Sequence, residues 1–163
     1  MPASAPVDVR VSRDVDATAQ TLYDLVSDVT QMGRWSPETV SADWLDGAGA
    51  AAVGVRFVGR NRLGGLRWST RPTIVAAEPG RRFAFTVPGR SGPTWTYTFE
   101  SVPGGCRVVE SVVQLRRSPL PIRLLQRRAG VVDRREHLRQ GMIATLCRLG
   151  EAAVALESRS SLA

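Results

Sequence analysis

Short strand-like segments alternate with turn signals between Thr39 and Leu115, and this alternation constrains the fold more than any other feature. The segments rich in β-branched and aromatic residues cover 39–45, 54–61, 66–77, 81–87, 94–102 and 106–115. Glycine-containing turns separate them, at Asp46-Gly47, Gly64-Gly65, Pro79-Gly80, Pro88-Gly89 and Pro103-Gly104-Gly105. Such short connections join antiparallel neighbours, because a parallel crossover needs about a dozen residues. The sequence therefore predicts one antiparallel meander and excludes a Rossmann-type unit.

The segments before the predicted meander begin with a further strand. Residues 7–14 alternate apolar and polar side chains, as in a half-buried strand. Residues 16–27 then change to helical spacing, with Asp16 as the expected N-cap. A short helical turn at 29–35 should end before Pro37, because a proline disfavours helix at the residue before it. One strand and two short helices are thus expected before the meander.

A long amphipathic helix is predicted near the C-terminus, over 122–157. Gly130 is expected to kink or interrupt it, so the firmly helical part is 132–157. One stripe of the helix should face the sheet, since its residues recur at steps of three and four. The stripe comprises Val131, Arg135, Leu138, Met142, Thr145, Leu149, Ala152 and Leu156.

Length and composition limit the class of protein further. A chain of 163 residues fits one domain, which we expect over 7–157 with loose termini at 1–6 and 158–163. A hydrophobic content of 43% excludes a disordered chain, and no apolar run approaches the ~20 residues of a membrane span. The first residues lack a secretory signal pattern, so we expect a cytoplasmic protein with reduced, buried cysteines.

Metal and cofactor chemistry has little support in the sequence. His137 is the only histidine, and Cys106 and Cys147 are the only cysteines. The usual zinc and iron sites draw several ligands from these residue types. The sequence therefore predicts neither a metal site nor a cofactor.

Five stretches of the sequence carry a resemblance to a known family: Val11-Ser-Arg-Asp-Val-Asp-Ala-Thr18, Leu22-Tyr-Asp-Leu-Val-Ser-Asp-Val-Thr-Gln-Met-Gly-Arg-Trp-Ser-Pro-Glu38, Gly54-Val-Arg-Phe-Val-Gly-Arg-Asn61, Trp95-Thr-Tyr-Thr-Phe-Glu100 and Gly104-Gly-Cys-Arg-Val108. They resemble the START-like superfamily, also called SRPBCC, the polyketide cyclase/dehydrase and lipid-transport group. The resemblance covers roughly 7–155, as for a bacterial single-domain member. It implies an α+β helix-grip fold, in which a curved antiparallel sheet of about seven strands wraps around the C-terminal helix. It also implies two short helices after the first strand and a ligand cavity between sheet and helix.

Strand parity indicates which side chains would line such a cavity. Trp95, Tyr97 and Phe99 share one face of their strand, and that face should point inward because an exposed aromatic patch is unfavourable. The same parity turns Glu110 inward together with Val108. The candidate ligand-binding residues are Trp35, Phe57, Asn61, Trp68, Phe85, Trp95, Tyr97, Phe99, Glu110, Arg135, Leu138 and Met142.

Glu110 is the candidate with the most distinctive chemistry. An inward carboxylate must be paired, hydrogen-bonded or protonated, because an isolated buried charge is very costly. Glu110 is therefore either an acid/base or ligand-binding group with a raised pKa, or one partner of a structural ion pair with Arg60 or Arg135. Arg135 has its own alternatives: it binds a ligand anion, pairs with Glu110 or points outward. Tyr97 is the second acid/base candidate.

The remaining candidates also carry two interpretations each. Asn61 either orients a ligand or caps the turn before Gly64-Gly65. Trp35 either belongs to a lid at the cavity mouth or anchors the second helix to the sheet. His137 is expected at the edge of the helix stripe or in solvent.

The net charge of +7 is concentrated in one segment. Residues 116–148 contain nine arginines and two acidic residues, whereas the rest of the chain is balanced and no lysine occurs. This segment is either an ordinary solvated face or a surface that binds anionic membranes. Nucleic acid is a disfavoured partner, because the aromatic side chains that could stack on bases are expected inside.

Three functions follow from the resemblance and the charge. The leading one is binding of a hydrophobic or aromatic small molecule, such as a lipid, a polyketide or an isoprenoid-like compound. The alternative is a polyketide cyclase/dehydrase of the aromatase/cyclase type, with Glu110 or Tyr97 as acid/base and Arg135 holding an oxygen. The third is binding to membrane or RNA through the segment Arg116–Arg148. Oligomeric state does not follow from the sequence.

Overall fold

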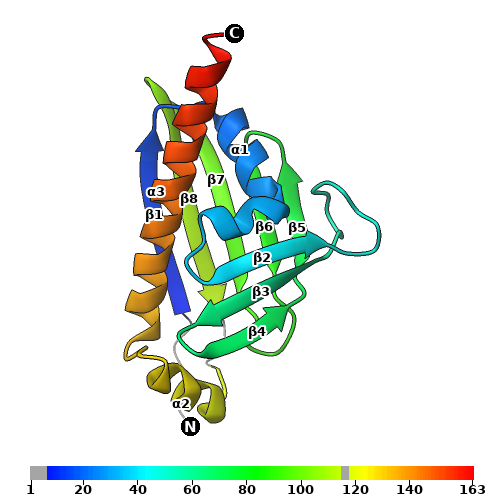
Figure 1. Cartoon of the computed structure of the whole chain (residues 1–163), viewed down its shortest axis with the longest axis vertical. Coiled ribbons are helices and arrows are strands. Elements are labelled where there is room, and N and C mark those ends of the chain that lie inside the picture. Colours follow the sequence, from blue (N-terminus) through cyan, green and yellow to red (C-terminus); the bar gives the residue numbers. More distant parts are fainter. Residues whose placement is uncertain (1–6, 115–117) are drawn as a thin grey trace.

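The computed structural model describes residues 7–114 and 118–163 (Figure 1). The strands are β1 (Val7–Val15), β2 (Thr39–Trp44), β3 (Phe57–Leu63), β4 (Leu66–Thr70), β5 (Thr73–Glu78), β6 (Arg82–Thr86), β7 (Thr94–Val102) and β8 (Gly105–Gln114). The helices are α1 (Ala19–Ser27), the 3₁₀ helix η1 (Val29–Arg34), α2 (Leu120–Arg128) and α3 (Arg134–Ser160). The predicted α+β class is confirmed.

All strand pairs are antiparallel and form two sheets. One sheet has the order β1-β8-β7-β6-β5, and the other has the order β2-β3-β4. The strand expected over 66–77 is divided by Arg71 and Pro72, so the fold has eight strands instead of about seven. A proline lacks the N–H that a continuous ladder needs at this point. An isolated bridge from Arg56 to Thr73 and the hydrogen bond from the Phe57 N–H to the Pro72 carbonyl connect the two sheets here.

The helices also begin and end differently from the prediction. Thr18, and not Asp16, caps α1, because its hydroxyl accepts a hydrogen bond from the Thr21 N–H. The helix expected over 122–157 is two helices, separated at Gly130, whose φ of +89° is unfavourable for other residues. Helix α3 continues to Ser160, into the tail that was expected to be loose. Residues 1–6 and the arginines 116 and 117 lie outside the described residues.

Helix α3 packs along the five-stranded sheet, chiefly over β1, while α1 covers β6, β7 and β8 (Figure 1). The buried stripe of α3 includes Leu138, Met142, Leu146, Leu149 and Ala153. The predicted stripe is buried at Val131, Leu138, Met142, Thr145 and Leu149 and half-buried at Ala152, but it was wrong at Arg135 and Leu156, which are exposed. Both residues lie near an end of α3, Arg135 in its first turn and Leu156 near its C-terminus.

No helix in the described part of the chain is long and apolar enough to cross a membrane.

Candidate functional site around Glu110

Glu110 and Tyr97 form a buried hydrogen-bonded pair in the middle of the five-stranded sheet. The two residues face each other across β7 and β8, and the Tyr97 hydroxyl donates to Glu110 Oε1 at 2.8 Å. Glu110 is only 2% exposed. Its second oxygen, Oε2, is also buried and has no hydrogen-bond partner among the described residues. A polar group with free hydrogen-bonding capacity therefore lies inside an apolar interior.

Burial determines the protonation state of this pair. Loss of solvent raises the pKa of Glu110 to about 8, although the hydrogen bond from Tyr97 acts in the opposite direction. Burial, and then the neighbouring carboxyl group, raise the pKa of Tyr97 well above its ordinary value. Both groups are consequently neutral near pH 7. Oε1 accepts from the phenol, so the carboxylic proton is available on Oε2 for donation.

The surroundings of the pair are apolar. Val11 lies opposite Glu110 on β1, and the rings of Phe83 and Tyr97 are 6.5 Å apart. A small hydrophobic cluster of Val9, Val112, Leu138 and Met142 joins the sheet to α3, with Val11 and Trp95 packed against it. The candidates Trp95, Leu138 and Met142 therefore lie in one cluster, on the strands that carry the pair and on the helix that covers them.

Three further aromatic candidates lie in the main hydrophobic core. Phe57, Phe85 and Phe99 are all buried there. Phe57 and Phe85 meet edge to face, with ring centroids 5.2 Å apart. Because Phe57 belongs to the three-stranded sheet and Phe85 to the five-stranded sheet, this contact joins the two sheets.

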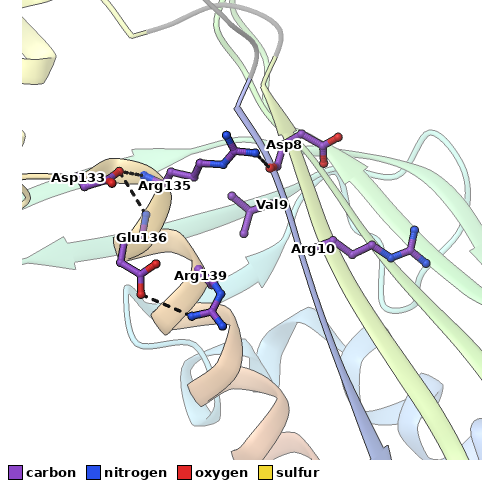
Figure 2. Close-up of a pocket in the computed structure, with 7 residues that line it drawn as sticks. All are labelled: Asp8, Val9, Arg10, Asp133, Arg135, Glu136 and Arg139. Atoms are coloured by element: carbon purple, nitrogen blue, oxygen red, sulfur yellow. Dashed lines mark hydrogen bonds and ion pairs between the residues drawn. The ribbon is translucent and has the colours of Figure 1, made fainter.

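Neither arginine considered as a partner for Glu110 contacts it. Arg60 points outward from β3 and pairs with Asp43. Arg135 is exposed in the first turn of α3, where its guanidinium donates to the Asp8 carbonyl at 2.8 Å (Figure 2). Both ion-pair alternatives were wrong, since Arg60 lies on the outward face of β3 and Arg135 lies in the exposed first turn of α3. The place predicted for Arg135 among the inward-facing ligand residues is wrong for the same reason.

Asn61 and Trp68 belong to the three-stranded sheet, whereas Trp35 shares the main hydrophobic core with Tyr97. Asn61 is half-buried, accepts from the Thr39 hydroxyl at 2.9 Å and lies opposite the half-buried Trp68 on β4. Trp35 is buried in the main core, and its carbonyl accepts from Arg148. This burial fits the interpretation of Trp35 as an anchor between helix and sheet.

A second polar cluster was not identified from the sequence. Glu38 Oε1 accepts from Arg134 Nη1 and contacts His137 Nε2, at 2.8 Å in each case. Burial raises the pKa of Glu38, but the charge and hydrogen bonds of Arg134 and His137 outweigh that effect and lower it overall. Arg134 and His137 share a helix face at a spacing of three residues. Nothing local indicates that Glu38 would meet them.

A pocket at the surface lies between β1 and the start of α3 (Figure 2). Its lining residues are Asp8, Val9, Arg10, Asp133, Arg135, Glu136 and Arg139. Several of its charged groups already have partners in the protein. Asp133 caps α3 by accepting from the N–H groups of Arg135 and Glu136, and Arg139 pairs with Glu136. This pocket does not include the Glu110 pair.

The fold is a helix-grip fold, and comparisons with known proteins place it in a family. Residues 6–137 match the family described as Polyketide cyclase / dehydrase and lipid transport. The chain therefore belongs to this family, and the predicted START-like superfamily is confirmed. No match was found among curated proteins.

Three solved structures illustrate the similarity. The Polyketide_cyc-like protein Cgl2372 from Corynebacterium glutamicum is 28% identical, with 98% of this chain and 95% of that chain covered and a TM-score of 0.58. The di-domain ARO/CYC StfQ from the steffimycin biosynthetic pathway is 18% identical, with coverage of 96% and 52% and a TM-score of 0.72. Major latex-like protein 151 from Panax ginseng is 11% identical, with coverage of 92% and 99% and a TM-score of 0.67. The last two similarities establish the shared fold.

Proposed function

We propose that this chain binds a small hydrophobic molecule between the five-stranded sheet and α3, and that Glu110 Oε2 donates a hydrogen bond to an oxygen of that molecule. The single observation that carries the proposal is the buried Oε2 atom, which has no partner among the described residues. Leaving such an atom unsatisfied costs about 1–3 kcal/mol. Native proteins keep few of these atoms, and each requires an explanation. A ligand oxygen would supply the missing partner.

The protonation state narrows the class of ligand. With a pKa of about 8, Glu110 is a neutral acid that donates near pH 7. A carbonyl, hydroxyl or ether oxygen accepts such a hydrogen bond without bringing a charge into the interior. The neighbouring side chains of Trp95, Leu138 and Met142 are apolar, as in most small-molecule sites. A lipid, polyketide or isoprenoid-like compound with one such oxygen has both properties.

The test begins with native mass spectrometry of the purified protein, followed by denaturing extraction of any bound molecule. We expect a stoichiometric, oxygen-containing hydrophobic compound. Glu110→Gln should retain it, because an amide keeps a donor at this position. Glu110→Leu should weaken binding about fivefold, since it removes one hydrogen bond of roughly 1 kcal/mol to the ligand.

An unliganded protein would require a second measurement before the proposal is rejected. Titrations with 1-naphthol and with oleic acid, followed by tryptophan fluorescence, would report weak binding near Trp95. A mass without ligand, together with no response to either probe, contradicts the proposal. Equal binding by wild type and Glu110→Leu would contradict the role of Glu110.

The same pair favours a second function, an activity of the aromatase/cyclase type. A carboxylic acid with a pKa of about 8 can protonate a carbonyl oxygen at neutral pH and recover the proton in a later step. Tyr97 would hold the carboxyl group in place. With a poly-β-ketone mimic as substrate, Glu110→Gln should keep binding and abolish turnover. Unchanged turnover would remove Glu110 as the acid/base group.

A further inference from the structure

Helix α2 contributes no side chain to the protein core. None of its nine residues is buried. It lies at one end of the molecule, below the start of α3 (Figure 1). Its large apolar side chains are open to solvent: Leu120 by 64%, Ile122 by 45%, Leu124 by 55% and Leu125 by 46%. Exposed leucines concentrated on one short helix differ from the scattered apolar residues of an ordinary surface.

Two of the three arginines of α2 lie opposite most of its apolar side chains. With 100° between successive residues, Ile122, Leu124 and Leu125 lie within an arc of about 160°, and Arg123 and Arg127 lie on the other side, next to Leu120. Arg128 falls between Leu124 and Leu125 around the axis, at the C-terminal end of the helix. The sequence from 118 to 132 contains no acidic residue. The helix is therefore amphipathic, and all of its charge is positive.

The neighbouring β3–β4 hairpin adds positive charge to this surface. A Cβ atom on Gly64, at the tip of the hairpin, would lie 3.9 Å from Ala129, directly after α2. Arg62 and Arg67 face each other across the hairpin, although like charges in opposed positions destabilise a sheet. Within the described residues, no acidic side chain pairs with these two arginines or with the three arginines of α2.

We propose that this α2 surface, formed by α2 together with Arg62 and Arg67, docks on an anionic membrane surface. A helix that lies in the bilayer interface buries its leucines among the acyl chains and keeps its arginines at the level of the phosphate groups. A second copy of this chain fits less well, because it would bring the same arginines against each other. RNA fits less well too, because α2 has no aromatic residue for stacking. The proposal is independent of the role of Glu110.

Co-flotation with vesicles tests the proposal. One set consists of phosphatidylcholine, and the other contains phosphatidylcholine mixed with phosphatidylglycerol. We expect binding to the mixed vesicles only, with affinity that decreases as salt increases. Replacement of Arg123, Arg127 and Arg128 by glutamine should weaken binding about a hundredfold, since each arginine near an anionic surface contributes about 1 kcal/mol. Leu124→Asp should weaken it at least about tenfold.

A matched control distinguishes the effect of charge on the α2 surface from the effect of the net charge of the whole protein. Replacement of Arg10, Arg13 and Arg90 by glutamine removes the same charge elsewhere and should leave binding within about twofold of wild type. All of these positions are exposed, and circular dichroism would confirm folding. Absence of binding to mixed vesicles overturns the proposal, as does equal binding by the α2 and control variants. Binding to RNA without vesicle binding, or a dimer that Leu124→Asp dissociates, also overturns it.

Discussion

Tyr97 and Glu110 occupy directly opposed positions on β7 and β8, and the phenolic hydroxyl donates to one carboxyl oxygen at 2.8 Å. The other carboxyl oxygen is left without a partner among the described residues. Opposed side chains on antiparallel strands are held at a nearly fixed distance by the backbone ladder. The pair is thus an acidic group held in a fixed position within the sheet.

Stability should depend on pH because of Glu110. Its pKa rises from 4.5 to about 8 on folding, so between these values the folded state holds a proton that the unfolded state has released. The contribution of Glu110 to stability is therefore complete below the unfolded pKa and is lost as pH rises through the folded pKa. The free energy of unfolding should decrease by about 1.4 kcal/mol per pH unit over this window.

Guanidinium unfolding, followed by tryptophan fluorescence at several pH values in this window, measures the slope. Glu110→Gln cannot ionise and should show a much smaller slope than wild type. Neither N–H of its amide group has an acceptor among the described residues, so its stability at low pH should be below that of wild type. Parallel pH profiles for the two proteins would show that Glu110 is ionised in the folded state.

Tyr97→Phe should destabilise the protein by about 1–3 kcal/mol, because it leaves both oxygens of Glu110 without a hydrogen bond. It should also raise the pKa of Glu110 further, since the bond from Tyr97 is the one contribution that lowers it. A double-mutant cycle with Glu110→Leu isolates the pair, because leucine removes both oxygens, whereas glutamine would still accept a hydrogen bond from Tyr97. Additive destabilisation in that cycle would mean that the pair contributes no coupling energy.

Local patterns were sufficient to predict the strands and the inward direction of Tyr97 and Glu110. The alternation of side chains in a strand depends only on sequence spacing, so β7 and β8 could be oriented without knowledge of their neighbours. The partner of Glu110 depends on register, which the Pro103-Gly104-Gly105 turn determines. The sequence was not used to derive this register. The prediction that Arg60 or Arg135 pairs with Glu110 was wrong, since both arginines have other partners.

The polar cluster at Glu38 could not have been predicted in this way. Glu38 and His137 are 99 residues apart, and they meet because α3 packs over the sheet close to the segment that follows η1. Periodicity places residues on a face of one element, whereas this contact depends on the relative position of two elements. In contrast, the break between β4 and β5 at Pro72 could have been predicted from the sequence, because a proline disfavours a continuous strand.

Gly33→Ala should destabilise the fold through a backbone collision. A Cβ atom at Gly33 would lie 2.3 Å from the Val40 carbonyl oxygen, so η1 or β2 would have to move. We expect a loss of at least about 2 kcal/mol, in the range of an overpacked site. Gly49→Ala is the control, since its Cβ would meet no atom within 4 Å. Equal thermal midpoints for both variants would show that the close approach is not rigid.

Glu38→Gln should destabilise the protein by about 1–3 kcal/mol at neutral pH. The reason is that Arg134 and His137 would then contact a neutral amide in place of a charged carboxylate. The Glu38 side chain is 20% exposed, so solvent compensates only part of this loss. The pKa of Glu38 is lowered in the folded protein. Its contribution is therefore present above the unfolded pKa and is lost as pH falls through the folded one, opposite to the effect of Glu110.

Asp43→Asn provides the matched control for Glu38→Gln, because it removes a carboxylate from an exposed pair with Arg60. Exposed ion pairs contribute little, so we expect a change within about 0.5 kcal/mol. Hydrogen exchange should distinguish the two variants as well. Loss of the Glu38 contacts should increase exchange in the first turns of α3, where Arg134 and His137 attach the helix to the segment after η1. Unchanged exchange in these turns would show that packing alone holds the start of α3.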